Sequence, residues 1–283
     1  MEAFRFSFNV FAIDSLQRFI STCRRAEKYG YDTVFAADHL GVPAPFPTLI
    51  AAAAATERLR VGTLVLNTGF WNPTLLARDI ATTDVLTNGR LDVGLGSGHM
   101  KWEYDEANVA FDSFAARARR LRETIDELTR QFSLNGYPQQ TEMRAEFHIP
   151  VLRPIQRRGF NGYGPPLIIG GTGNRMLQLA AERADVVSIA GIYQVHGQVP
   201  GVMRLATPTE IDDRISYVHE CAGDRADQLE WHTMIQAVVP TDDRRGAAEK
   251  IAQQHGNNMT AEEVLQLPQI HIGTITQIGA SRV

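Results

Sequence analysis

The sequence predicts an α/β fold of the (β/α)8 TIM-barrel class, and three observations indicate it. Short runs rich in β-branched and aromatic residues alternate with helical patterns, which is typical of βα units and a parallel sheet. No linker rich in Pro, Gly or Ser and no internal repeat divides the 283 residues. Polar and glycine-rich clusters follow several expected strands, as they do at the functional face of a barrel. An open doubly wound sheet is the alternative architecture.

In the first half of the chain, turn and cap residues delimit the expected elements. Asp14 is expected to cap the first helix, with Gln17 three residues later as in a capping box, and Gly30 to end it. Pro73 opens a later helix at a position where its missing N–H costs nothing, and an Asn-Gly pair closes that helix. The expected strands are 4–10, 33–36, 59–66 and 91–95, and further helices are expected at 48–56 and 114–132.

In the second half, strands are expected at 167–169, 186–189 and 231–239, and helices at about 174–183, 208–222 and 243–255. After 231–239, only Gln269–Ile278 offers a further pattern, so we expect a barrel that lacks its last βα unit. We expect a single barrel domain over residues 1–283, with insertion loops at about 97–113, 133–164 and 191–206. A loop as long as 133–164 is usually functional or mobile.

The composition excludes several classes of protein. The apolar fraction of 44% is ordinary for a globular chain, and the net charge of −4 gives no reason to expect nucleic acid or an anionic membrane as partner. Two cysteines do not form a disulfide framework, and no paired ligand spacing predicts a metal site. No signal peptide and no long apolar run is found, so a soluble cytoplasmic protein is expected.

Candidate chemistry lies in four clusters at strand ends, which are Asp38-His39, Asn67–Gly69, Gly94–His99 and Gly170–Arg175. The imidazole of His39 is suited to general acid or base work near neutral pH, and so is that of His99. A structural hydrogen-bonding role is the plainer interpretation of either histidine. The glycines of Gly94–His99 either let a planar cofactor lie against the backbone or only shape a loop.

The sharpest cluster is the sequence IIGGTGNR, in which three glycines stand between a strand and a helix. Free N–H groups at a helix N-terminus form a ready anion site, and Arg175 would add a cation. The stretch is neither a Walker A loop nor a dinucleotide fingerprint. A glycine-rich turn before a capped helix is the alternative interpretation.

Three stretches, taken in order, resemble the luciferase-like monooxygenase superfamily, and specifically its branch dependent on the deazaflavin coenzyme F420. They are AEKYGYDTVFAADHL, then ATERLRVGTLVLNTGFWNPTLLARDIATTDVLTNGRLDVGLGSGHM, then PPLIIGGTGNRMLQLAAERADVVSIAG. A Glu-Tyr pair, here Glu103-Tyr104, follows the GxGxGHM motif as in one group of the family. The resemblance covers about residues 1–190.

The resemblance implies a barrel that binds a flavin or deazaflavin at the carboxyl ends of its strands. It places Asp38 and His39 near the reactive ring and a non-proline cis peptide at Thr63-Leu64. The F420-dependent sugar-phosphate dehydrogenases carry a glutamate acid where this chain has His99, so their acid–base pair does not transfer unchanged. We hypothesise instead that His39 and His99 share the proton transfer. The expected cofactor-binding residues are Asp38, Thr63, Leu64, Asn67, Gly96, Ser97, Gly98, Gly170, Gly171, Thr172 and Arg175.

The leading functional hypothesis is an F420-dependent oxidoreductase that moves a hydride between the deazaflavin and a small organic substrate. The second is an FMN-dependent monooxygenase that receives reduced flavin from a partner reductase. A non-catalytic flavin-binding or structural protein is the third, and a metal-dependent barrel hydrolase is the fourth. A homodimer is expected from the resemblance, whereas no motif predicts the substrate.

Overall fold

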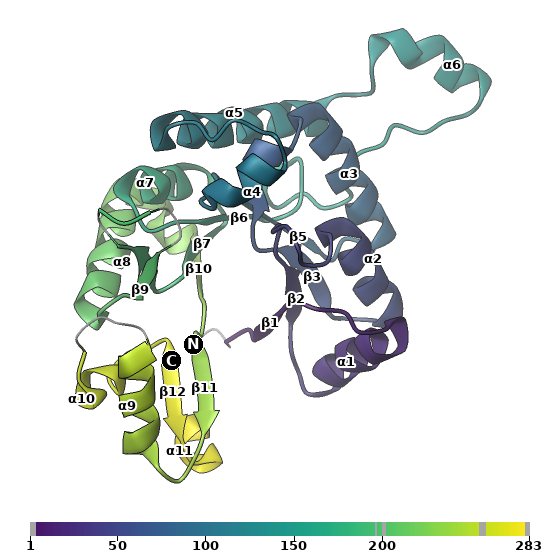
Figure 1. Ribbon diagram of the computed structural model, residues 1–283. Coiled ribbons are helices and arrows are strands. Elements are labelled where there is room, and N and C mark those ends of the chain that lie inside the picture. Colours follow the sequence, from purple (N-terminus) through teal and green to yellow (C-terminus); the bar gives the residue numbers. More distant parts are fainter. Residues whose placement is uncertain (1–3, 196, 200–201, 255–258, 281–283) are drawn as a thin grey trace. The chain divides into compact units, whose positions relative to one another are not determined.

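The computed structural model describes residues 4–195, 197–199, 202–254 and 259–280 (Figure 1). The chain forms two compact units: unit 1 holds residues 1–98, 102–169 and 183–185, and unit 2 holds 99–101, 170–182 and 186–283. None of the described helices is both long enough and apolar enough to cross a membrane. The insertion loop expected at 191–206 lies partly outside the described residues.

Unit 1 is built on a parallel sheet in which the strands Thr33–Ala36 and Leu91–Gly96 are buried throughout, as expected for strands covered on both faces. Its strands run in the order β1 Ser7–Val10, β2 Thr33–Ala36, β3 Arg60–Thr63, β5 Leu91–Gly96 and β6 Leu167–Gly170, and β4 Leu66–Asn67 also pairs with β5. The strand predicted at 59–66 is therefore two strands, and a cis peptide bond between Leu64 and Val65 lies where they separate.

The helices of unit 1 connect these parallel strands, as crossover connections require. They are α1 Leu16–Lys28, α2 Pro45–Ala55, α3 Pro73–Leu86, α4 Lys101–Glu106, α5 Phe114–Ser133 and α6 Thr141–Glu146. Pro73 begins α3 as predicted, and the Asn72 side chain caps the amides of Thr74 and Leu75. In Figure 1, the excursion that carries α6 extends away from α3 and α5.

The cap predicted for the first helix is wrong by one residue. Ser15 is the N-cap, in extended conformation, and its hydroxyl accepts a hydrogen bond from the Arg18 amide. The Asp14 carboxylate instead accepts from the Arg18 guanidinium at 3.0 Å. Both residue types are good caps, so the sequence pattern alone does not separate them.

Unit 2 contains the parallel pair β7 Val186–Ile189 and β10 Glu230–Thr233, the hairpin β8 Ile192–Gln194 with β9 Met203–Leu205, and the parallel pair β11 Ala237–Pro240 and β12 Ile270–Gly273. Its helices are α7 Asn174–Arg183, α8 Pro208–Ala222, α9 Arg244–Gln254, α10 Ala261–Val264 and α11 Ile275–Ala280. The prediction of one strand at 231–239 is wrong: β10 ends at Thr233, and β11 pairs with β12 in a separate sheet. Between them, the Gln236 amide donates to the Gln269 carbonyl.

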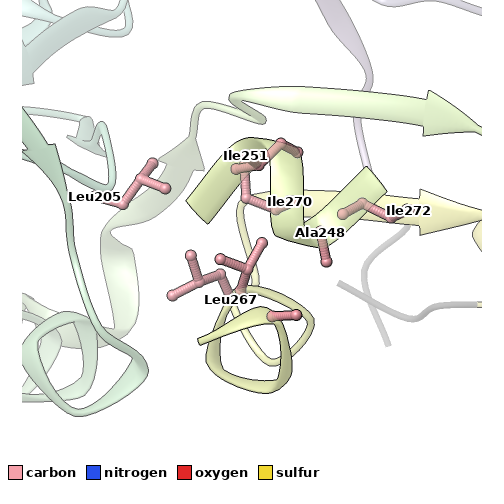
Figure 2. Packing of buried hydrophobic residues seen from close by; sticks show 8 residues of the cluster. Leu205, Ala248, Ile251, Leu267, Ile270 and Ile272 are labelled. Carbon is pink, nitrogen blue, oxygen red and sulfur yellow. The ribbon is translucent and has the colours of Figure 1, made fainter. Parts of the chain in front are cut away.

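An apolar cluster stabilises the β11–β12 part of unit 2 (Figure 2). Ala248 and Ile251 of α9 pack with Ile270 and Ile272 of β12, and Leu267 closes the group. The adjoining Gln269 is 1% exposed, and its amide donates to the carbonyls of Gly191 and Ala206. Since buried carbonyls need donors, this side chain ties β12 to the segments beside the β8–β9 hairpin.

Candidate active site

Asp38 stands just after β2, and two donors converge on one of its carboxylate oxygens. Its Oδ2 accepts from the Asn67 amide at 3.0 Å and from the Trp71 indole N–H at 2.8 Å. Burial raises the pKa of Asp38 above its ordinary value, and these two donors partly oppose the shift because they favour the charged form. The strand ends of β2 and β4 are thereby joined through one carboxylate.

His39 contacts a buried acid that comes from α4. Its Nδ1 lies 2.8 Å from Glu103 Oε1, and the same oxygen accepts from the Leu40 amide at 3.1 Å. The Glu103 side chain is 2% exposed, whereas that of His39 is 36% exposed. A buried carboxyl therefore contacts one ring nitrogen of an accessible imidazole. This arrangement is suited to a positioned proton carrier.

Tyr104, the next residue of α4, is fully buried and reaches β4 and the end of β5. Its hydroxyl donates to Asn67 Oδ1 at 2.8 Å and lies 3.2 Å from the Ser97 carbonyl. The ring contacts those of Phe70 and Phe111, each with centroids 5.0 Å away. Burial raises the pKa of Tyr104, so the phenol stays a neutral donor. In the sequence, the Glu103-Tyr104 pair is only a family marker, and its contacts emerge from the structure.

Packing within unit 1 explains the glycines in the second half of β5 and just after it. A Cβ at Gly94 would overlap the Thr63 carbonyl, and one at Gly96 would lie 2.6 Å from the Val65 side chain. At Gly98, where φ is +72°, a Cβ would meet Tyr104 and Asn67. These glycines therefore allow close approach of the chain to itself.

The region of the expected cis peptide is held between β3 and β5. The bond found lies at Leu64-Val65, one position after the Thr63-Leu64 pair named from the sequence. The Thr63 hydroxyl donates to the Gly94 carbonyl at 2.9 Å and accepts from the Gly94 amide at 2.8 Å. Within unit 1, Thr63 is thus bonded to Gly94 of β5, the Leu64 amide donates to the Ala36 carbonyl of β2, and Asp38 is bonded to Asn67.

In unit 2, the glycine-rich turn before α7 is open on one side. A Cβ at Gly173 would meet nothing within 4 Å, and one at Gly170 would approach only Ser188, at 3.7 Å. Gly173 occupies the N-cap position, because its carbonyl accepts from the amides of Met176 and Leu177. Thr172 is half-buried, and Arg175 is exposed. An accessible helix N-terminus beside a cationic side chain fits a phosphate group.

Two further positions complete the set of predicted residues. Gly171 is constrained, since its amide donates to the Ser188 carbonyl at 3.4 Å and a Cβ there would lie 2.5 Å from Met176. His99 is exposed and belongs to unit 2, whereas His39 belongs to unit 1. Shared proton transfer by the two histidines stays a prediction.

A family model described as luciferase-like monooxygenase matches residues 5–271. The F420-dependent glucose-6-phosphate dehydrogenase of Nakamurella multipartita is 27% identical over 229 residues, covering 78% of this chain and 63% of that protein. The oxygenase component of the flavin-dependent trigonelline monooxygenase of Acinetobacter baylyi is 33% identical over 111 residues, covering 38% of this chain and 31% of that protein. The chain spans less than two thirds of the length of these curated relatives.

A solved structure supports the fold class independently. The coenzyme F420-dependent tetrahydromethanopterin reductase from Methanopyrus kandleri matches with a TM-score of 0.64 at 18% identity, covering 90% of this chain and 76% of that chain. The predicted fold class, a barrel of the luciferase-like type, is thereby confirmed.

Proposed function

The chain belongs to the luciferase-like monooxygenase family, and from this we propose that it is an oxidoreductase that transfers a hydride between coenzyme F420 and a small organic substrate. The observation that carries the proposal is the His39–Glu103 pair, with Nδ1 2.8 Å from the buried carboxyl oxygen. Oxidation of an alcohol by hydride loss also releases the hydroxyl proton. A positioned and accessible imidazole is suited to take up that proton.

The bound deazaflavin would supply the hydride acceptor or donor, which is chemistry that no protein side chain offers. The protein's part is to bind, orient and move the proton. On this proposal His39 exchanges the proton with the substrate oxygen, and His99 is proposed from the sequence alone as a second proton carrier. The residues proposed to hold the ring region are Asp38, Thr63, Leu64, Asn67, Gly96, Ser97 and Gly98.

For the phosphate of the cofactor we propose the turn before α7, with Gly170, Gly171, Thr172 and Arg175. The fit is supported by the open space beside Gly170 and Gly173 and by the helix N-terminus that follows. A small-molecule substrate, a homodimer and a cytoplasmic location complete the proposal.

The alternative is an FMN-dependent monooxygenase that takes reduced flavin from a partner reductase. The observation that favours it is the 33% identity to the oxygenase component of the trigonelline monooxygenase. The two functions differ in the cofactor bound and in the need for dioxygen, so binding of each cofactor separates them.

The test is titration of the protein with oxidised F420 and, separately, with FMN, followed by tryptophan fluorescence. Trp71 is a suitable reporter because its indole contacts Asp38. We expect micromolar binding of F420 and much weaker binding of FMN. Tight FMN binding without F420 binding would favour the monooxygenase, and binding of neither would favour a non-catalytic structural protein.

Gly173 offers a matched pair of variants for the same titration. Asp and Asn are both preferred N-cap residues, so Gly173→Asp and Gly173→Asn preserve α7 at a position with room for a side chain. Only Gly173→Asp adds a negative charge at the proposed phosphate site. We expect it to weaken F420 binding at least tenfold more than Gly173→Asn, and equal effects would exclude this turn as the phosphate site.

A further inference from the structure

The contacts of Glu103 restrict where the proton of His39 lies. Glu103 Oε1 receives the Leu40 amide at 3.1 Å, and a backbone N–H is always a donor. The same oxygen is 2.8 Å from His39 Nδ1. Because Oε1 already acts as an acceptor towards Leu40, it is suited to accept from His39 as well, which requires the proton to be on Nδ1.

We infer that Glu103 is a positioning residue, which fixes His39 in the Nδ1–H tautomer so that Nε2 is the nitrogen that exchanges a proton. The ring nitrogens of histidine are distinct, and the partner of one determines the protonation of the other. The tautomer assignment stands on the contacts alone, whereas its catalytic consequence rests on the proposed function.

The segment that carries Glu103 is anchored at both of its buried residues. Glu103 holds His39 and Leu40 after β2, while Tyr104 donates to Asn67 in β4 and is buried beside it. A short helix fastened to two strand ends leaves its side chains few alternative positions. The buried Glu103 carboxyl is therefore held with Oε1 towards His39, whereas an acid on the surface would be free to rotate.

The consequence for the reaction is a division of tasks between two residues. With a deazaflavin bound to accept the hydride of a substrate alcohol, His39 Nε2 would take up the hydroxyl proton, leaving a carbonyl product. The imidazolium that results keeps its Nδ1–H bond to Glu103, whose carboxylate stabilises the added charge. In the opposite direction, the same nitrogen returns the proton to the oxygen.

The test uses two variants of Glu103 and nitrogen-15 NMR of histidine-labelled protein, at a pH where His39 is neutral. Glu103→Gln keeps an oxygen that accepts from Leu40 and His39, whereas Glu103→Leu keeps bulk but no acceptor. We expect the Nδ1–H tautomer in the wild-type protein and in Glu103→Gln, and a shift towards Nε2–H in Glu103→Leu. The His39 signals are assigned by their loss in His39→Asn.

Turnover and folding provide the second readout. Glu103→Leu is expected to lower kcat about 10- to 100-fold, with KM within about threefold, and Glu103→Gln to recover part of the loss. Glu106→Leu, an exposed change on the same helix, is the control and should alter neither tautomer nor kcat. Circular dichroism identifies any variant that fails to fold.

Two results would overturn the inference: an Nε2–H tautomer in folded wild-type protein, or an unchanged tautomer in Glu103→Leu. The NMR measurement needs neither cofactor nor substrate. If it gives the expected tautomers while F420 does not bind, the positioning role of Glu103 is supported and the proposed function fails. If F420 binds but the tautomers differ from those expected, the positioning role of Glu103 fails and the proposed function is supported.

Discussion

The Trp71 indole donates a hydrogen bond to Asp38 Oδ2 at 2.8 Å, and the Asn67 amide donates to the same oxygen at 3.0 Å. Asp38 is thereby stabilised as a carboxylate at a partly buried position, where burial alone raises its pKa. The contact joins the end of β2 to the segment after β4. Its contribution to the free energy of unfolding is expected to depend on pH.

Trp71→Phe removes one of the two donors and is expected to cost about 1–2 kcal/mol of unfolding free energy at neutral pH. Because the pKa of Asp38 is raised on folding, the folded state binds the proton more tightly, and stability falls as pH rises through this region. The indole N–H favours the charged form of Asp38, so the loss in Trp71→Phe should shrink near pH ~2, where the carboxyl is protonated in both states. Urea unfolding at the two pH values measures it, with the exposed Trp102→Phe as control. An equal loss at both pH values would contradict the account.

Asp84 is predicted to be a major structural contact of α3. It is fully buried and accepts from the amides of Ile155 and Gln156, at 2.7 and 3.0 Å. Asp84→Ala leaves both donors without a partner and is expected to cost about 3 kcal/mol in denaturant unfolding. Asp79→Ala on the same helix breaks only a partly exposed ion pair and should cost under about 1 kcal/mol. Similar losses in the two variants would refute this role.

Gly98 is expected to resist substitution even by alanine. Its φ is +72°, and a Cβ would meet Tyr104 and Asn67. Gly98→Ala should lower stability by about 2 kcal/mol or more, through backbone conformation and overlap together. Gly173→Ala, where the space is open, should lose at most about 1 kcal/mol, from the weaker N-cap. Thermal unfolding compares them, and a harmless Gly98→Ala would contradict the packing described.

The contribution of Glu127 to stability is predicted to depend on pH in the opposite direction to that of Asp38. The Arg130 guanidinium lowers the pKa of Glu127 to about 2, with Gln131 also donating to it. A carboxyl whose pKa is lowered on folding stabilises the protein above its unfolded pKa, and this contribution is lost as pH falls towards about 2. Glu127→Gln should cost under about 1 kcal/mol at neutral pH, because the pair is partly exposed, and only a small part of that at pH ~2, where the carboxyl is half protonated in the folded state. Glu123→Gln is the exposed control on the same helix. Urea unfolding at neutral pH and at pH ~2 measures the loss of unfolding free energy in each variant.

The order of strands and helices could be predicted from the sequence because periodicity and turn residues act locally. The strand Thr33–Ala36 and the helix that Pro73 begins agree with the structure. Ser and Asp are both good N-cap residues, so the sequence does not show that the helix begins after Ser15 rather than after Asp14. The run 231–239 looks continuous, yet its halves pair with β7 and β12, and such pairing is not encoded in a local pattern.

The same limit applies to the candidate site. Asp38, His39 and Asn67 can be picked out because they follow strands, whereas no local pattern singles out Trp71. Glu103 was visible as half of a Glu-Tyr pair, but its contact with His39 spans 64 positions of sequence. Only the fold brings these two side chains together. Burial of an acid after a glycine-rich strand end is the signal that would have drawn attention to it.

The most direct test of the central claim is an anaerobic assay of oxidised F420 with a panel of small alcohols, followed by loss of the cofactor's fluorescence. We predict reduction of F420 by the wild-type protein with at least one alcohol. In His39→Asn the rate should fall at least about 100-fold while F420 still binds. An unchanged rate in His39→Asn would contradict the role of His39. Failure of F420 reduction, together with oxygen-dependent consumption of reduced FMN, would contradict the hydride-transfer function itself.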